Sequence, residues 1–167
     1  MEANEHSTYL GLPNIIGRNK SAILGYLKDN VNMRIRSWDG IFISRAGKEI
    51  LVKQVAQALP VYAMNVFLLP QEITTSIEKC LMKYWWSSGQ TNNSKVIWMN
   101  WDRLSKHKST GGMGFRNFRD FNIVMLGKQL WRLATNTQSL VSRLYKARYF
   151  DKTDVIHAGL GHNPSFI

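Results

Sequence analysis

The apolar residues of this chain recur every three or four positions, and this spacing constrains its fold more than any other feature. Residues spaced in this way share one face of an α-helix. The clearest stripe follows Pro70 and consists of Ile73, Ile77, Leu81, Tyr84 and Trp85. Proline suits the first turn of a helix, and the Ser-Ser-Gly run at 87–89 suits its end. The pattern therefore predicts an amphipathic helix from about residue 70 to residue 86.

The same spacing predicts two helices before Pro70. The first begins at Ser21, ends at the Asp-Gly pair 39–40, and carries the stripe Ile23, Leu27, Val31, Ile35 and Trp38. The second begins near Ser44 and carries the stripe Leu51, Val55, Ala58 and Tyr62. Pro60 should kink or end it, because proline lacks the backbone donor and clashes one turn back. The apolar run 61–69 fits either a short helix or an extended connection.

Two further helices are predicted after residue 95. One covers 118–134, with the stripe Phe121, Val124 or Met125, Lys128 and Trp131, and Asn136 stops it. The other runs from about Ser139 to Tyr149. Before them, residues 96–101 fit either a short strand or a tight hydrophobic clasp. The expected fold is mainly α, a helical bundle followed by a smaller aromatic-rich helical part with at most short strands. The expected divisions are 1–19, 20–88, 89–150 and a loop-like tail at 151–167.

The basic charge of the chain is unevenly distributed. The 167 residues carry 22 basic and 11 acidic side chains, for a net charge of +11. Residues 14–60 have a net charge of +5, residues 61–90 are neutral, and residues 91–150 have a net charge of +9. Two basic segments thus flank a neutral apolar helix, which is the charge pattern of a nucleic-acid binder. A simpler interpretation is that lysine and arginine occupy solvated helix faces.

The residue types exclude several other classes of site. The single cysteine, Cys80, rules out an internal disulfide and a paired-cysteine zinc site, and its place beside an apolar stripe indicates an inert thiol. No two acids are adjacent, so the paired-carboxylate box that holds two metals in polymerases is absent. We therefore predict no catalytic residue, no metal site and no cofactor. No apolar stretch is long enough to span a membrane, and we expect a soluble intracellular protein.

A glycine-rich basic turn and the tryptophans supply the remaining binding candidates. The turn spans 106–116, and Lys106, Lys108 and Arg116 should give it affinity for phosphate. It lacks the spacing of a nucleotide-binding phosphate loop, so we interpret its glycines as structural. Tryptophan rings can stack on bases. Trp86 and Trp98 are the candidates for exposed stacking residues, whereas we assign Trp38, Trp85 and Trp131 to the core because they fall on helical stripes.

An ordered series of short blocks resembles plant LINE-type (non-LTR) retrotransposon reverse transcriptases. The resemblance covers nearly the whole chain, roughly residues 9–166, and extends to short plant mitochondrial reading frames derived from such elements. Each block alone is weak, and their order and spacing make the match specific. The blocks are 9–13 (YLGLP), 35–38 (IRSW), 44–53 (SRAGKEILVK), 59–64 (LPVYAM), 67–70 (FLLP), 84–89 (YWWSSG), 97–98 (IW) with Trp101, 111–116 (GGMGFR), 121–122 (FN), 127–132 (GKQLWR) and 146–150 (KARYF).

The resemblance implies where this chain would lie in such an enzyme. Residues 1–19 would be a remnant of the junction between palm and thumb, residues 20–88 a thumb-like bundle, and residues 89–150 a basic post-thumb region. The palm carboxylates, which bind Mg²⁺ in the complete enzyme, would precede residue 9 and are absent here. By the same analogy Arg45, Lys48 and Lys53 would face the backbone of the primer-template. Contacts of this kind confer affinity without sequence choice.

These considerations lead to one principal functional expectation and its alternatives. We expect a fragment of an RNA-directed DNA polymerase that lacks its catalytic palm and binds RNA or DNA without sequence preference. Six or so phosphate contacts would make binding depend steeply on salt, at about −0.9 per contact in a log–log plot. The alternatives are a decayed reading frame without activity and a protein-interaction module that contacts the missing palm or a second copy. The residues leave both the nucleus and the mitochondrion open as compartments.

Overall fold

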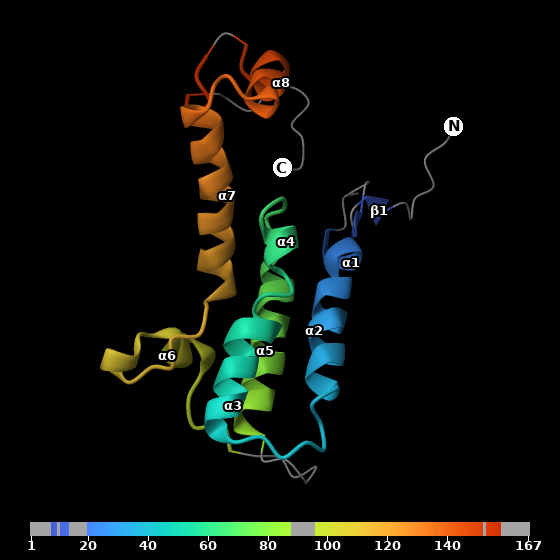
Figure 1. Cartoon of the computed structure of the whole chain (residues 1–167), viewed down its shortest axis with the longest axis vertical. Helices are drawn as coiled ribbons and strands as arrows, with labels where there is room; N and C mark the ends of the chain where they lie inside the picture. Colours follow the sequence, from blue (N-terminus) through green and yellow to red (C-terminus); the bar gives the residue numbers. More distant parts are fainter. Residues whose placement is uncertain (1–7, 10, 14–19, 88–95, 152, 158–167) are drawn as a thin grey trace.

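The computed structural model describes residues 8–9, 11–13, 20–87, 96–151 and 153–157, and within them the chain is mainly helical, as predicted (Figure 1). Strands β1 (Thr8–Tyr9) and β2 (Leu12–Pro13) form a two-residue antiparallel pair. The helical elements are α1 (Lys20–Leu24), α2 (Tyr26–Arg36), α3 (Arg45–Ile50), η1 (Leu51–Ala56), α4 (Val61–Met64), α5 (Gln71–Trp86), α6 (Trp101–Ser105), η2 (Lys108–Thr110), α7 (Phe118–Thr135) and α8 (Leu140–Tyr149). The expected division between 20–88 and 89–150 falls outside the described residues.

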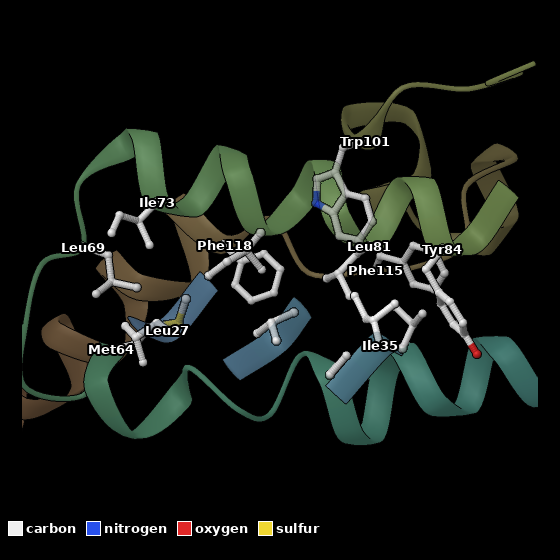
Figure 2. Close-up of a cluster of buried hydrophobic side chains, with 14 of the residues drawn as sticks. Leu27, Ile35, Met64, Leu69, Ile73, Leu81, Tyr84, Trp101, Phe115 and Phe118 are labelled. Atoms are coloured by element: carbon white, nitrogen blue, oxygen red, sulfur yellow. The ribbon is translucent and has the colours of Figure 1, made fainter. Parts of the chain in front are cut away.

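Helix α5 is the centre of the bundle and confirms the helix predicted after Pro70. It contacts α1, α2, η1, α6 and α7. All five residues of its predicted stripe are buried, together with Thr74. Figure 2 shows side chains from α2, α4, α5, α6 and the start of α7 meeting in one apolar cluster, which includes Leu27, Met64, Leu81, Trp101 and Phe118. Helix α6 and the start of α7 therefore share a core with the bundle.

Side-chain caps fix several of the predicted helix starts. The Ser44 hydroxyl accepts a hydrogen bond from the Gly47 backbone N–H at 3.2 Å, and the Ser139 hydroxyl accepts one from Ser142 at 3.1 Å. Such caps satisfy N–H groups that have no partner inside the helix. Asn136 ends α7, as predicted. The second predicted helix ends at Ala56, four residues before Pro60, and the run 61–69 begins with the short helix α4, whose N-cap is Pro60.

Two expectations about local structure are wrong. The first predicted helix is divided at Gly25 into α1 and α2, although Leu27, Val31 and Ile35 of its stripe are buried as expected. Glycine weakens a helix interior because it has the most backbone freedom to lose. Residues 96–100 form neither a strand nor a clasp, since Val96, Ile97 and Trp98 are exposed. Only Trp101, at the start of α6, is buried.

The buried face of the second predicted helix differs from the expected stripe. The side chains that enter the core are Lys48, Val52 and Ala56, whereas Tyr62 and Ala58 are exposed. Residues 51–56 form a π-helical turn, which widens the helix and changes which side chains share a face. Lys48 is buried because its ammonium group donates to the backbone oxygens of Tyr84 and Ser87 at the C-terminal end of α5. That end carries the negative pole of the helix dipole.

The assignment of Trp131 to the core is also wrong. Its side chain is 67% exposed, while Trp85 is buried and Trp38 is half-buried against Tyr84, with ring centroids 5.4 Å apart. Helix α7 packs against α4 and α5 through its N-terminal half, where Phe118 and Asn122 are buried. Its C-terminal half extends past the bundle towards α8 (Figure 1). The apolar residues there fall on a helical stripe, but the bundle does not reach them.

Candidate nucleic-acid interface

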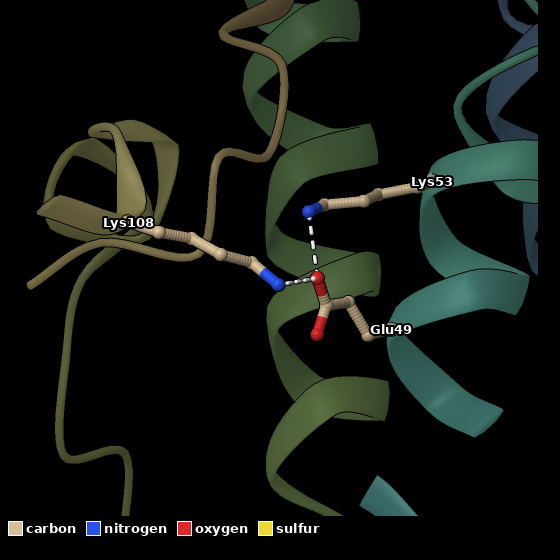
Figure 3. Close-up of polar contacts among 3 residues, drawn as sticks. All are labelled: Glu49, Lys53 and Lys108. Carbon is tan, nitrogen blue, oxygen red and sulfur yellow. Dashed lines mark hydrogen bonds and ion pairs between the residues drawn. The ribbon is translucent and has the colours of Figure 1, made fainter. Parts of the chain in front are cut away.

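The fold brings together two basic segments that are far apart in the sequence. One is residues 45–53 on α3 and η1, and the other is the glycine-rich turn 106–116. Glu49 Oε1 accepts hydrogen bonds from Lys53 Nζ and Lys108 Nζ, each at 2.7 Å (Figure 3). The Arg116 guanidinium donates to the Gln57 backbone oxygen at 3.5 Å. We call the surface formed by Arg45, Lys53, Lys106, Lys108 and Arg116 the basic face.

Backbone hydrogen bonds and glycines shape the turn that presents Lys106 and Lys108. The Gly114 N–H donates to the Lys106 oxygen at 2.8 Å, and the Met113 N–H donates to the Leu104 oxygen at 2.9 Å. Gly111 and Gly114 have φ angles of 79° and 67°, which favour glycine. A Cβ added at Gly112 would lie 2.1 Å from the Lys106 oxygen. The glycines are therefore structural, as the sequence predicts.

An aromatic stack holds this turn against the bundle. The buried Phe115 ring lies 5.2 Å from Trp85 in an edge-on arrangement and 5.4 Å from Trp101 in a stacked one. The Trp101 indole N–H donates to the Arg116 backbone oxygen at 3.1 Å. Large aromatic surfaces stabilise such contacts strongly, and the buried indole donor is satisfied. The turn thus has an anchorage that does not depend on its charged residues.

The predicted phosphate-binding residues differ in how open they are to a ligand. Lys106 is exposed, and the Lys108 side chain is 60% exposed. The exposed Arg45 donates to the Trp85 backbone oxygen at 2.9 Å, and its guanidinium lies 5.5 Å from the Trp86 ring centroid. The guanidinium of Arg116, which is half-buried, lies 4.6 Å from the centroid of the Phe121 ring. Both arginines are therefore oriented by the fold.

Lys48 does not belong to this surface, although it was predicted with Arg45 and Lys53. It is buried, and its ammonium group is bound to the end of α5. A buried cation that already has hydrogen-bond acceptors is costly to withdraw for an outside ligand. We therefore assign Lys48 a structural role. Its neighbour Arg45, three residues earlier, remains exposed.

The two tryptophans predicted to stack on bases lie in different environments. Trp98 is 75% exposed and stands before α6, so its ring is open to a ligand. Trp86 is half-buried at the end of α5, where its ring lies 6.5 Å from that of Trp85. Arg45 lies near the Trp86 ring, so cation–π contact already engages part of that surface. Of the two rings, that of Trp98 is the more accessible for stacking on a base.

Glu49 is the residue of this site that the sequence interpretation missed. Hydrogen bonds from Lys108 and Lys53 hold the pKa of its carboxyl below the usual range. Its spacing of four from Lys53 is the signal that could have pointed to an ion pair. The contact with Lys108 has no signal in the sequence, because 59 positions separate the two residues. A carboxylate thus lies inside a surface otherwise built from cations.

The pKa of a second carboxylate, Glu78, is shifted in the opposite direction. Burial raises the pKa of its carboxyl, and the nearby Asp102 and Asp120 raise it further, while a hydrogen bond from the Phe118 N–H at 3.0 Å opposes them. This carboxylate satisfies a backbone N–H in the first turn of α7, whose side-chain cap is Asn117. Among the described residues no three histidine, cysteine, aspartate or glutamate side chains gather as ligands for a metal ion. The hydrogen bond to Phe118 makes Glu78 part of the packing of α5 against α7.

No helix within the described ranges has both the length and the apolar character needed to cross a membrane. Neither a family model nor a solved structure matches the chain.

Two curated proteins are similar to this chain. It is 37% identical over 110 residues to the uncharacterized mitochondrial protein AtMg00310 of Arabidopsis thaliana, a match that covers 65% of this chain and 71% of that protein. It is 27% identical over 125 residues to the putative ribonuclease H protein At1g65750 of the same plant, covering 75% of this chain and 20% of that protein. The chain thus spans about a fifth of this second relative. Such a pair of relatives is typical of retroelement-derived sequences, and this chain belongs to the family of the mitochondrial protein AtMg00310.

Proposed function

We propose that this chain binds RNA or DNA without sequence preference through the basic face. The observation that carries the proposal is the convergence of residues 45–53 and 106–116, which the contact of Glu49 Oε1 with Lys108 Nζ at 2.7 Å joins. Lysine and arginine side chains bind phosphate groups regardless of the bases attached to them. The exposed ring of Trp98 adds a surface on which a base can stack.

The origin that best accounts for this surface is the thumb and post-thumb region of a LINE-type reverse transcriptase. The two Arabidopsis relatives and the ordered sequence blocks support that origin. In the proposed role the chain binds a nucleic-acid backbone and catalyses no reaction itself. Mg²⁺-dependent strand synthesis would require palm carboxylates, which the proposed thumb and post-thumb region does not include. The chain is then a binding fragment of an RNA-directed DNA polymerase.

The burial of Lys48 and the neutralisation of one lysine by Glu49 lower the expected number of phosphate contacts from six to about four. Binding to a short duplex should therefore show a log–log salt slope of about −3.6, at roughly −0.9 per contact. Titrations at several salt concentrations measure this slope. Lys106→Gln should make it shallower by about 0.9. Arg36→Gln, on the exposed end of α2, removes the same charge and should leave the slope unchanged.

A binding constant that does not vary with salt, or no binding at low salt, would contradict the proposal. Equal effects of Lys106→Gln and Arg36→Gln would show that only total charge matters and that the basic face is not the site. Thermal unfolding of both variants provides the check on folding, because each replaces an exposed side chain.

A second candidate function is a protein-interaction module, which the exposed apolar face of α7 and α8 favours. The large apolar side chains there are Ile123, Val124, Leu130, Trp131, Leu140, Val141 and Leu144, and all are exposed. Large apolar side chains that gather on exposed helices often mark a contact site. Sedimentation during the same titrations separates the two functions. Self-association of a protein that binds no nucleic acid would favour the interaction module.

A further inference from the structure

Lys53 and Lys108 converge on a single oxygen atom. Both ammonium groups lie 2.7 Å from Glu49 Oε1, and they approach it from η1 and η2 (Figure 3). Two cations that touch one oxygen lie within a few ångströms of each other, where they would repel if no anion stood between them. The arrangement therefore defines a position for one negatively charged oxygen.

We propose that Lys53 and Lys108 form a binding site for one phosphate group of a nucleic-acid backbone, and that the carboxylate of Glu49 occupies it in the free protein. A carboxylate and a phosphodiester each carry one negative charge and present oxygen acceptors to ammonium donors. Replacing one by the other keeps both lysines paired. Glu49 then limits the affinity of the basic face, since an incoming phosphate must displace it. This inference rests on the proposed nucleic-acid binding.

The position is open enough for a phosphate to reach it. The side chain of Lys108 is 60% exposed, that of Lys53 is 25% exposed, and that of Glu49 is 19% exposed. Gly114 lies alongside, and a Cβ there would be 3.7 Å from Lys53 Nζ. The absence of a side chain at Gly114 leaves room beside the ammonium group. Lys106, on the same turn, is exposed and can bind the next phosphate.

A purely structural role for Glu49, in which it fastens the turn to α3, is the competing interpretation. The turn has other anchors, because Phe115 stacks on Trp101 and the Trp101 indole N–H donates to Arg116. The Arg116 guanidinium also reaches the Gln57 oxygen on the bundle. The two roles predict opposite signs for the loss of Glu49. If Glu49 holds the turn in place, its loss should weaken nucleic-acid binding. If Glu49 competes with phosphate, its loss should strengthen binding.

The test compares the variants Glu49→Gln and Glu72→Gln in duplex titrations. Both remove one negative charge, and Glu72 is an exposed residue in the first turn of α5, about 20 Å along that helix from the end near Arg45. Glu49→Gln should bind several-fold tighter at low salt and make the salt slope steeper by about 0.9, because one further lysine becomes available. Glu72→Gln should keep the wild-type slope.

Lys108→Gln completes the experiment. Alone, this substitution should change the salt slope little, since Glu49 already neutralises one of the two lysines. In the Glu49→Gln background it should abolish the increase in affinity and in salt slope. If Glu49→Gln binds no better than Glu72→Gln while thermal unfolding shows it folded, the inference is overturned. Glu49→Ser is a second variant that removes the carboxylate without introducing an amide, and the same expectation applies to it.

A second readout separates this inference from the proposed function. NMR signals of the Lys108 side chain are followed while inorganic phosphate is added to the wild type and to Glu49→Gln. The variant should show a saturating shift at lower phosphate concentrations than the wild type. An identical response in both proteins overturns the inference. Wild-type protein that binds no duplex at low salt contradicts the proposed function instead, and the phosphate response still decides whether Glu49 occupies the site.

Discussion

Asn122 is the buried polar residue that joins α7 to the connection between α4 and α5. Its side-chain oxygen accepts the Leu69 N–H at 2.8 Å, and its amide donates to the backbone oxygens of Met64 and Phe67 at 2.9 and 3.0 Å. Its side chain satisfies three backbone groups of a segment that lies between helices. Buried backbone groups without partners are costly, so this one amide fixes how the segment packs.

We expect Asn122→Ala to lower the free energy of unfolding by about 3 kcal/mol, because it leaves buried donors and acceptors unpaired. Urea denaturation followed by circular dichroism measures the change. Asn30→Ala, an exposed residue of α2, is the matched control and should alter stability by no more than about 0.5 kcal/mol. Equal effects of the two substitutions would show that the hydrogen bonds of Asn122 contribute little.

Periodicity gave no role to Asn122, which appeared only within the resemblance block 121–122, and the resemblance placed Lys48 toward the primer-template, whereas the structure buries both side chains. Periodicity identifies apolar side chains that share a face, and both of these residues are polar. Their burial depends on acceptors and donors supplied by α5 and by the segment before it. Those partners are 36 and 53 positions away in the sequence. Only the tertiary arrangement shows that the polar groups are satisfied.

At the scale of elements, caps and prolines predicted most helix bounds well, whereas periodicity gave the wrong buried face in the second predicted helix and wrongly placed Trp131 of α7 in the core. The starts at Ser44 and Ser139 and the helix after Pro70 agree with the structure. The buried face of α3 and η1 does not, because a π-helical turn departs from the 3.6-residue repeat on which the stripe was read. Gly112 in the turn 106–116 and Gly127 in α7 test how the stability of each element depends on the space around a single Cβ.

Gly112→Ala and Gly127→Ala should have opposite effects on stability. At Gly112 a Cβ would meet the Lys106 oxygen at 2.1 Å, so we expect the turn to distort at a cost of at least about 2 kcal/mol. At Gly127, inside α7, a Cβ meets nothing within 4 Å, and alanine should stabilise the helix by about 0.5–1 kcal/mol. Urea denaturation measures both. A stabilised Gly112→Ala protein would contradict the geometry of the turn.

At the scale of the whole molecule, the basic face depends on packing that no local pattern reveals. The sequence supplied two basic segments and a neutral helix between them, and the resemblance supplied the expectation that Arg45 and Lys53 face a backbone. That the turn 106–116 lies beside them follows from the edge-on contact of Phe115 with Trp85 and its stacking on Trp101. The extension of α7 beyond the bundle, which leaves Trp131 exposed, was equally unpredictable from its own stripe.

The most direct test of the account is an NMR titration that maps where nucleic acid touches the chain. Backbone amide signals are assigned and followed while a short duplex of mixed sequence is added at low salt. We predict that shifts concentrate in residues 45–53 and 106–116, and that a duplex of different sequence shifts the same signals. Shifts confined to α7 and α8, or no shifts at all at low salt, would contradict the claim that this chain binds nucleic acid through its basic face.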